Sequence, residues 1–175
     1  MARPPNLEAR EHILDAALGL FHARGYRGVS MDDVAAEAKL GKSNLFHYYP
    51  SKDELGVAVL ERACRSAKAD VTASLAGDGD PVETVKGIFD SYAAGMEKSG
   101  CYKGCFIGNM AQEMSDENED LRLRVAEHLR FWTAELAGFL RRRKEAGALR
   151  RDLDCEAAAA ALVSLLEGGT LMAKA

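Results

Sequence analysis

The chain has 175 residues, a formal net charge of −4 at pH 7 and a pI of about 5.6. This length is enough for one compact fold or two small subdomains with a sizeable hydrophobic core. The acidic balance excludes indiscriminate coating of nucleic acid, so any DNA contact must depend on where the basic side chains lie. No signal-peptide pattern is present, and the longest apolar run, residues 157–166, is too short to cross a bilayer. We therefore expect a cytoplasmic protein without a membrane partner.

The four cysteines show no spacing typical of a disulfide framework: Cys64, Cys101, Cys105 and Cys155. No histidine lies near enough in sequence to Cys101 and Cys105 to indicate a zinc site, and reduced thiols are expected in the cytoplasm. The sequence therefore predicts no metal site and no cofactor.

The sequence predicts helices throughout, and the first covers residues 7–24. Its apolar side chains recur at helical spacing on one stripe: Ile13, Leu14, Ala17, Leu18 and Phe21. Gly25 follows as a C-cap. We expect this helix to support the unit that comes next.

Residues 30–49 predict two short helices joined by a tight turn. Ser30 precedes Met31, and Asp33 can complete a capping box, so a helix should begin at Met31. A second helix should follow over residues 42–49 and end at Pro50. Its apolar side chains, four residues apart, are expected to face inward: Leu45 and Tyr49.

The remaining side chains of the second helix suit contact with DNA. They offer one cation and several short hydrogen-bond donors near a positive helix N-terminus: Lys42, Ser43, Asn44, His47 and Tyr48. Ser51 and Glu54 form a second capping box, so a third helix should begin at Lys52. A lysine at that helix start would face a DNA phosphate.

Residues 8–63 resemble the N-terminal domain of the tetracycline-repressor (TetR) family of bacterial regulators, and LFHYYPSKDEL matches the family's recognition helix nearly residue for residue. The resemblance implies an all-α fold. Residues 1–55 would form a three-helix helix-turn-helix DNA-binding domain, and residues 56–175 a helical ligand-sensing and dimerisation domain. It also implies phosphate contacts by Ser30, Lys42, Tyr48 and Lys52. Contacts in or beside the groove would come from Ser43, Asn44, Phe46 and His47.

Two positions depart from the family pattern. Lys39 stands where the turn usually has glycine, so we expect a positive φ there at a cost of about 1 kcal/mol. Gly41 stands where a serine cap is common, so the recognition helix should start without a side-chain cap.

The rest of the chain predicts a helical domain. The helix that begins at Lys52 should run to about residue 75, and four more should follow over about residues 82–99, 105–114, 120–144 and 155–175. The last two carry apolar and small residues that fit a four-helix dimer interface. A homodimer suits a pseudo-palindromic operator with half-sites about 34–36 Å apart.

The string from Gly104 to Glu113 resembles the ligand-domain motif of a TetR branch that responds to reactive electrophiles and small unsaturated acids. In that branch a cysteine matching Cys105 can be the reactive group. A helix N-terminus favours the thiolate form, and Lys103 and Lys174 are candidate cations nearby. Cys101 is a second candidate thiol. A buried, unreactive Cys105 is the alternative interpretation.

A non-covalent inducer would instead bind among aromatic and methionine side chains that include Tyr92, Met96 and Trp132. The main hypothesis is a dimeric repressor that a small-molecule or thiol-reactive inducer releases from double-stranded DNA. The alternatives are a thiol-based redox enzyme that uses Cys101 and Cys105, and a helical interaction module without DNA binding. No Cys-x-x-Cys motif or βαβ pattern supports the enzyme.

Overall fold

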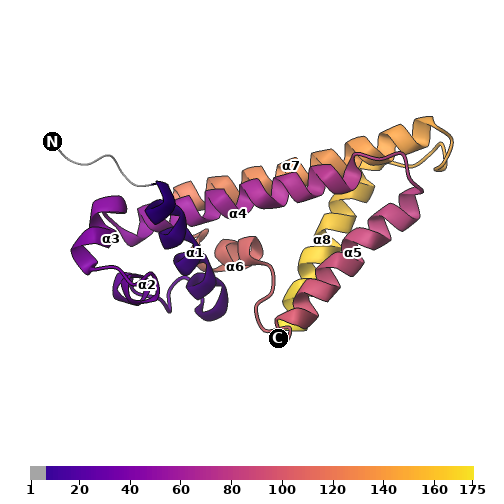
Figure 1. Cartoon of the computed structure of the whole chain (residues 1–175). Coiled ribbons are helices and arrows are strands. Elements are labelled where there is room, and N and C mark those ends of the chain that lie inside the picture. Colours follow the sequence, from indigo (N-terminus) through magenta and orange to yellow (C-terminus); the bar gives the residue numbers. More distant parts are fainter. Residues whose placement is uncertain (1–6) are drawn as a thin grey trace.

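The computed structural model describes residues 7–175, and every regular element in that range is an α-helix (Figure 1). The helices are α1 (Leu7–Arg24), α2 (Met31–Glu37), α3 (Lys42–Tyr48), α4 (Lys52–Leu75), α5 (Pro81–Lys98), α6 (Phe106–Met114), α7 (Glu119–Glu145) and α8 (Cys155–Lys174). The predicted all-α fold is therefore confirmed for the described residues.

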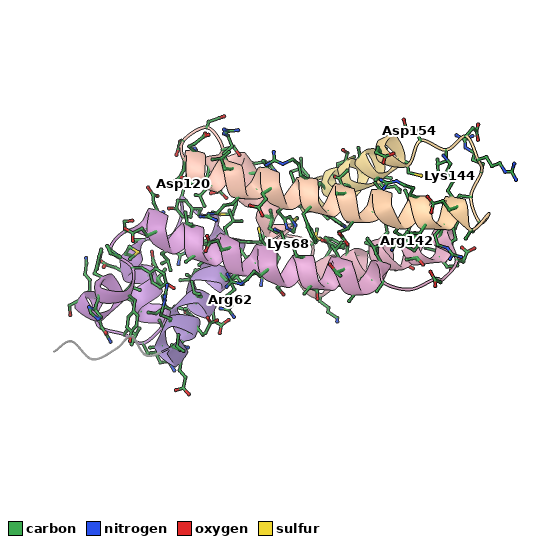
Figure 2. The ribbon with its side chains drawn as sticks, turned by 90° about the horizontal axis from the view of Figure 1, so that it is seen from above. Arg62, Lys68, Asp120, Arg142, Lys144 and Asp154 are labelled. Atoms are coloured by element: carbon green, nitrogen blue, oxygen red, sulfur yellow. The ribbon has the colours of Figure 1, made fainter. Side chains whose placement is uncertain are left out.

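Helices α1, α2 and α3 gather at one end of the molecule around the start of α4 (Figure 1). The long helices α4 and α7 lie side by side in both views, and α5 packs against α8 (Figures 1 and 2). The short helix α6 lies between the α1–α3 end and the α5–α8 pair. Helix α4 crosses the predicted domain boundary between residues 55 and 56 without a break.

Two hydrophobic cores hold these helices together. The first joins α1 to α4 and also includes the apolar face of α6 and the start of α7, with Ile13, Phe21, Leu55, Met110 and Leu121 among its buried members. The second lies farther along α4 and α7 and is closed by α5 and α8; it includes Val71, Trp132, Phe139, Ala159 and Val163. Because α6 belongs to the first core, it packs with α1, α2, α3 and the start of α4, the predicted DNA-binding end.

Charged side chains on α4 tie it to its neighbours. Arg62 contacts Asp15 of α1 at 2.5 Å, and Lys68 contacts Glu127 of α7 at 2.9 Å. Figure 2 shows both basic residues along α4. At the far end of α7, Arg142 donates to the last carbonyl of α4, that of Leu75, at 2.9 Å. The end of α4 therefore has a side-chain partner for one of its free carbonyls.

Helix α8 is the one helix in residues 7–175 that is long and apolar enough, by length and composition, to cross a membrane. The sequence analysis considered only the uninterrupted apolar run of residues 157–166, whereas the helix that contains it has 20 residues. Cys155, Ala159 and Val163 nevertheless belong to the second core, and a core helix passes the same test. Its outer face leaves Leu165 and Met172 exposed.

Candidate nucleic-acid interface and ligand pocket

The capping box at the start of α2 forms as predicted. The Ser30 hydroxyl accepts a hydrogen bond from the Asp33 amide at 3.1 Å, and an Asp33 carboxylate oxygen accepts one from the Ser30 amide at 2.7 Å. These bonds give two amides at the helix start a partner. The Ser30 hydroxyl also donates to the Asp33 carboxylate at 2.6 Å, and this bond, with the one from the Ser30 amide, lowers the pKa of Asp33. They fix where α2 begins.

The turn between α2 and α3 shows both expected departures. Lys39 has a φ of 53°, which is the left-handed conformation that favours glycine. Gly41 is the N-cap of α3 and provides no side-chain hydrogen bond. The first amides of α3 are therefore open to another acceptor, such as a phosphate oxygen.

Helix α3 is divided into an inner and an outer face. Leu45 and Tyr49 are 0% and 3% exposed, as predicted, and hold the helix against the first core. The predicted DNA contacts on this helix lie on the outer side: Lys42, Ser43, Asn44, Phe46 and His47 are exposed, and Tyr48 is half-buried. The Lys42 ammonium lies 2.8 Å from an Asp32 carboxylate oxygen, so contact with a phosphate would replace this exposed ion pair.

Lys52 lies at the start of α4, but its ammonium packs over the ring of Tyr26, 4.3 Å from the centroid. Partial burial lowers the pKa of Lys52. The Tyr26 hydroxyl donates to Asp53 at 2.6 Å, and burial raises the Tyr26 pKa. Gly56 leaves room for this ring, because a Cβ atom there would lie 2.6 Å from a ring carbon. The Tyr26 cluster thus sets the position of the α4 start.

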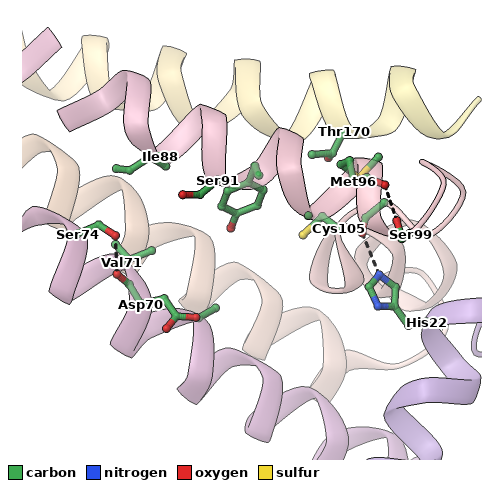
Figure 3. Close-up of a pocket in the computed structure, with 14 residues that line it drawn as sticks. His22, Asp70, Val71, Ser74, Ile88, Ser91, Met96, Ser99, Cys105 and Thr170 are labelled. Atoms are coloured by element: carbon green, nitrogen blue, oxygen red, sulfur yellow. Dashed lines mark hydrogen bonds between the residues drawn. The ribbon is translucent and has the colours of Figure 1, made fainter. Parts of the chain in front are cut away.

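A pocket of about 510 Å³ lies between α4, α5 and α8 and is closed at one end by the loop before α6 (Figure 3). Tyr92, Met96 and Cys105, all predicted sensor residues, line it. A second hollow of about 500 Å³ opens beside it between α5 and α8, where Cys101 lies in its wall. The structure therefore brings four of the six predicted sensor residues to two adjoining hollows.

The other two predicted sensor residues line neither hollow. Trp132 is 2% exposed and stacks on Tyr92 with ring centroids 5.6 Å apart, so it supports the wall. Lys174 donates to the side-chain oxygen of Asn109 at 3.0 Å, and the Asn109 amide donates to the Lys103 carbonyl at 2.7 Å. Lys174 therefore holds the loop that carries Cys105.

Cys105 is the N-cap of α6, and its sulfur accepts a hydrogen bond from the Gly108 amide at 3.4 Å. Burial and the neighbouring Glu167 nevertheless raise the pKa of the Cys105 thiol to about 12. The expectation of a thiolate at this helix N-terminus is wrong for this state, because desolvation and a nearby carboxyl outweigh the helix amides.

His22 is a pocket residue that the sequence analysis missed. It comes from α1, and its Nε2 atom lies 2.9 Å from the Gly104 carbonyl, so a neutral ring with the proton on Nε2 donates there. Its ring also meets Phe106 edge-on at 5.7 Å. Burial is the largest of the effects that lower the His22 pKa. No local pattern links residues 82 positions apart, so the sequence held no signal for this contact.

The far end of α6 also contacts the DNA-binding end. The Arg27 amide donates to the Glu113 carboxylate at 3.1 Å, its guanidinium donates to the Glu113 carbonyl at 2.9 Å, and it forms an ion pair with Glu117. Gly25, with a φ of 76°, lets the chain pass close to Glu113. Helix α6 is thus held at both ends by the C-terminal part of α1 and the segment after it.

All four cysteines are free thiols, and no group of His, Cys, Asp and Glu within residues 7–175 could hold a metal ion. The part of the chain that the structure describes therefore offers an exposed face on α3 and a pocket, with no centre for metal chemistry in that range.

Comparison with known proteins agrees with this arrangement. The family descriptions "Bacterial regulatory proteins, tetR family" and "Tetracyclin repressor-like, C-terminal domain" match residues 13–59 and 81–175. The transcriptional regulator AcuR of Cereibacter sphaeroides is 29% identical over 167 residues, which cover 95% of this chain and 76% of AcuR.

Two solved structures share the fold closely. A regulatory protein TetR from Rhodobacter sphaeroides and the reduced form of Escherichia coli NemR each have a TM-score of 0.87 and 27% identity. Each similarity covers 95% of this chain, with 88% and 87% of the respective structures. The chain therefore belongs to the TetR family of DNA-binding transcriptional regulators, which are not enzymes.

Proposed function

We propose that this regulator binds a pseudo-palindromic operator as a homodimer and is released by a small-molecule or thiol-reactive inducer that enters the pocket at Cys105. One observation carries the proposal. The pocket has His22 of α1 in one wall and Cys105 of the loop before α6 in another, so an occupant touches both the DNA-binding end and the sensor helices.

The exposed face of α3 supports the operator contact. Lys42, Ser43, Asn44 and His47 lie outward while Leu45 anchors the helix, which is the arrangement that a helix in a major groove requires. Ser30, Tyr48 and Lys52 flank it and would meet the backbone phosphates. Because the partner is chromosomal DNA, we assign the protein to the cytoplasm.

The outer surfaces of α7 and α8 support the homodimer. Leu165, Leu171 and Met172 on α8 are exposed apolar side chains, and a hollow of about 570 Å³ runs over α7 beside Ala134 and Ala137. A second copy of the chain would bury this apolar surface. The two DNA-binding ends, one from each copy, would then be held at a fixed spacing.

Release would follow from a change in that spacing. An occupant or a Cys105 adduct that favours one arrangement of α6 over another changes the positions of α1 and α3, because Arg27 and His22 tie α6 to α1. A preference of a few kcal/mol is enough to shift such a two-state equilibrium.

The test is fluorescence-anisotropy binding to the DNA upstream of the protein's own gene, with and without a thiol-reactive electrophile. Tight binding that is lost on treatment is expected for the wild-type protein and for Cys101→Ser, the matched control. Cys105→Ser should bind equally well but stay bound. Binding that electrophiles never weaken would refute the thiol-reactive form and leave a non-covalent inducer.

A further inference from the structure

A carboxyl group lies beside the Cys105 thiol in the wall of the pocket. The Cys105 thiol and the Glu167 carboxyl of α8 act on each other: Glu167 raises the pKa of the thiol, and Cys105 lowers that of the carboxyl. A Glu167 carboxyl oxygen and the Cys105 sulfur lie 2.6 Å and 3.8 Å, respectively, from the position that a Cβ atom on Gly108 would take. Both groups therefore border the space that a side chain at position 108 would fill, and Gly108 leaves that space open.

This thiol is a weak nucleophile unless a base assists it. With a pKa of about 12, Cys105 has a very small thiolate fraction at neutral pH. Burial also raises the pKa of Glu167, which makes its carboxylate a stronger base than an exposed glutamate. General base catalysis requires a base within reach of the proton that it removes, here the Glu167 carboxylate and the Cys105 thiol proton.

Other ionisable side chains lie nearby: His22, Asp70 and Tyr92 line the same pocket, and Lys103 and Lys174 are close enough to lower the pKa of His22. Most have another partner or act at a distance. His22 donates to the Gly104 carbonyl, Lys174 donates to Asn109, and Asp70 affects the pKa of Tyr92. Among the described residues, Glu167 is the carboxylate that acts on the pKa of the Cys105 thiol.

We propose that Glu167 is the general base that takes the Cys105 proton when the thiol adds to an α,β-unsaturated carbonyl compound in the pocket; this rests on the thiol-reactive form of the proposed function. The sulfur lone pair forms a bond to the β carbon while the alkene π electrons move toward the carbonyl. The thiol proton passes to the Glu167 carboxylate, which returns it to the α carbon. The S–H group has then added across the double bond, and no oxidant or cofactor is consumed.

The test uses the full chain with acrylamide as the probe and follows Cys105 modification by peptide mass spectrometry across a range of pH. For the wild-type protein we expect a rate that changes little with pH around neutrality. Glu167→Gln should react about 100-fold more slowly at neutral pH, the usual size of general base assistance. Its rate should then rise about tenfold per pH unit, as for an unassisted thiol.

The direction of the change separates a base from a neighbouring charge. Removal of a nearby negative charge lowers the pKa of a thiol, so E167Q would react faster if Glu167 were only a neighbouring charge. Glu167→Asp keeps a carboxylate and should recover part of the rate, whereas a variant that is only misfolded would not. Asp90→Asn, which removes an exposed carboxylate of α5 outside both hollows, is the matched control and should keep the wild-type rate and pH profile.

The two proposals fail in different ways. If E167Q reacts as fast as the wild-type protein or faster, Glu167 is not the base, and the proposed function stands. If wild-type Cys105 stays unmodified while Cys101 reacts, both the base and the thiol-reactive inducer are refuted.

Discussion

Replacement of Gly56 by alanine should damage the DNA-binding end of the molecule. A Cβ atom at this position in α4 would lie 2.6 Å from a ring carbon of Tyr26. The ring has little freedom to move, because Tyr26 is 4% exposed, packs 5.1 Å from the Phe21 ring and donates its hydroxyl to Asp53. The clash must therefore displace the start of α4 or the Tyr26 cluster.

The size of the effect follows from two opposing contributions. Overpacking of a tight core costs about 3 kcal/mol at the upper end of its usual range. Replacement of glycine by alanine inside a helix returns about 1 kcal/mol. We therefore expect Gly56→Ala to lower the free energy of unfolding by about 2 kcal/mol and to weaken operator binding, because Lys52 packs on the same ring.

Gly87→Ala is the matched control. Gly87 also lies inside a helix, α5, but a Cβ atom there would meet nothing within 4 Å. This variant should gain about 1 kcal/mol and leave DNA binding unchanged. The assay is urea unfolding at equal protomer concentration, since stability is linked to any dimerisation. An equal or greater stability of G56A would refute the reasoning from the Tyr26 contact.

Three further predictions concern DNA, coupling and pH. Lys42→Ala should weaken operator binding and reduce the slope of log affinity against log salt by about one, while Lys86→Ala on the remote helix α5 should change neither. Arg27→Ala should preserve operator binding but make the inducer about tenfold less effective in the anisotropy assay, because α6 loses a tie to α1. The pKa values of His22 and His128 are lowered, mainly by burial. In the unfolded chain both histidines bind protons more readily. Their contribution to the free energy of unfolding should therefore be fully present above a pH of about 6.5 and be lost as the pH falls below it. His22→Asn should make that fall shallower in urea titrations.

Local chemistry explains why much of the fold could be predicted from the sequence. The capping box at Ser30, the N-cap at Ser51, the C-cap at Gly25 and the break at Pro50 each act within a few residues, and all lie at helix ends in the structure. At Ser51 only half of the predicted box forms: its hydroxyl accepts from the Glu54 amide at 3.1 Å. The positive φ of Lys39, by contrast, was expected from the resemblance to the family, whose turn usually has glycine at this position. Periodicity was less reliable in α5, where Val82 is exposed at the first turn although it continues the apolar stripe.

The pocket could be predicted only in part because its chemistry depends on distant neighbours. Cys105 was expected at a helix N-terminus, and it lies there, but its protonation depends on Glu167, which is 62 positions away in sequence. Likewise, no spacing rule connects His22 to Gly104. Such contacts depend on how α1, α6 and α8 pack, and that packing is fixed by the cores and not by any local signal.

The same packing explains how a change at Cys105 could reach DNA without a large motion. Phe106 and Met110 of α6 share the first core with Phe21 of α1, so α6 cannot shift without repacking side chains that position the DNA-binding end. Cores of this kind tolerate discrete rearrangements better than gradual deformation. An adduct that displaces Cys105 would therefore favour a second packing of α6 against α1. The hydrogen bonds of His22 to Gly104 and of Arg27 to Glu113 would couple this change to both ends of α6.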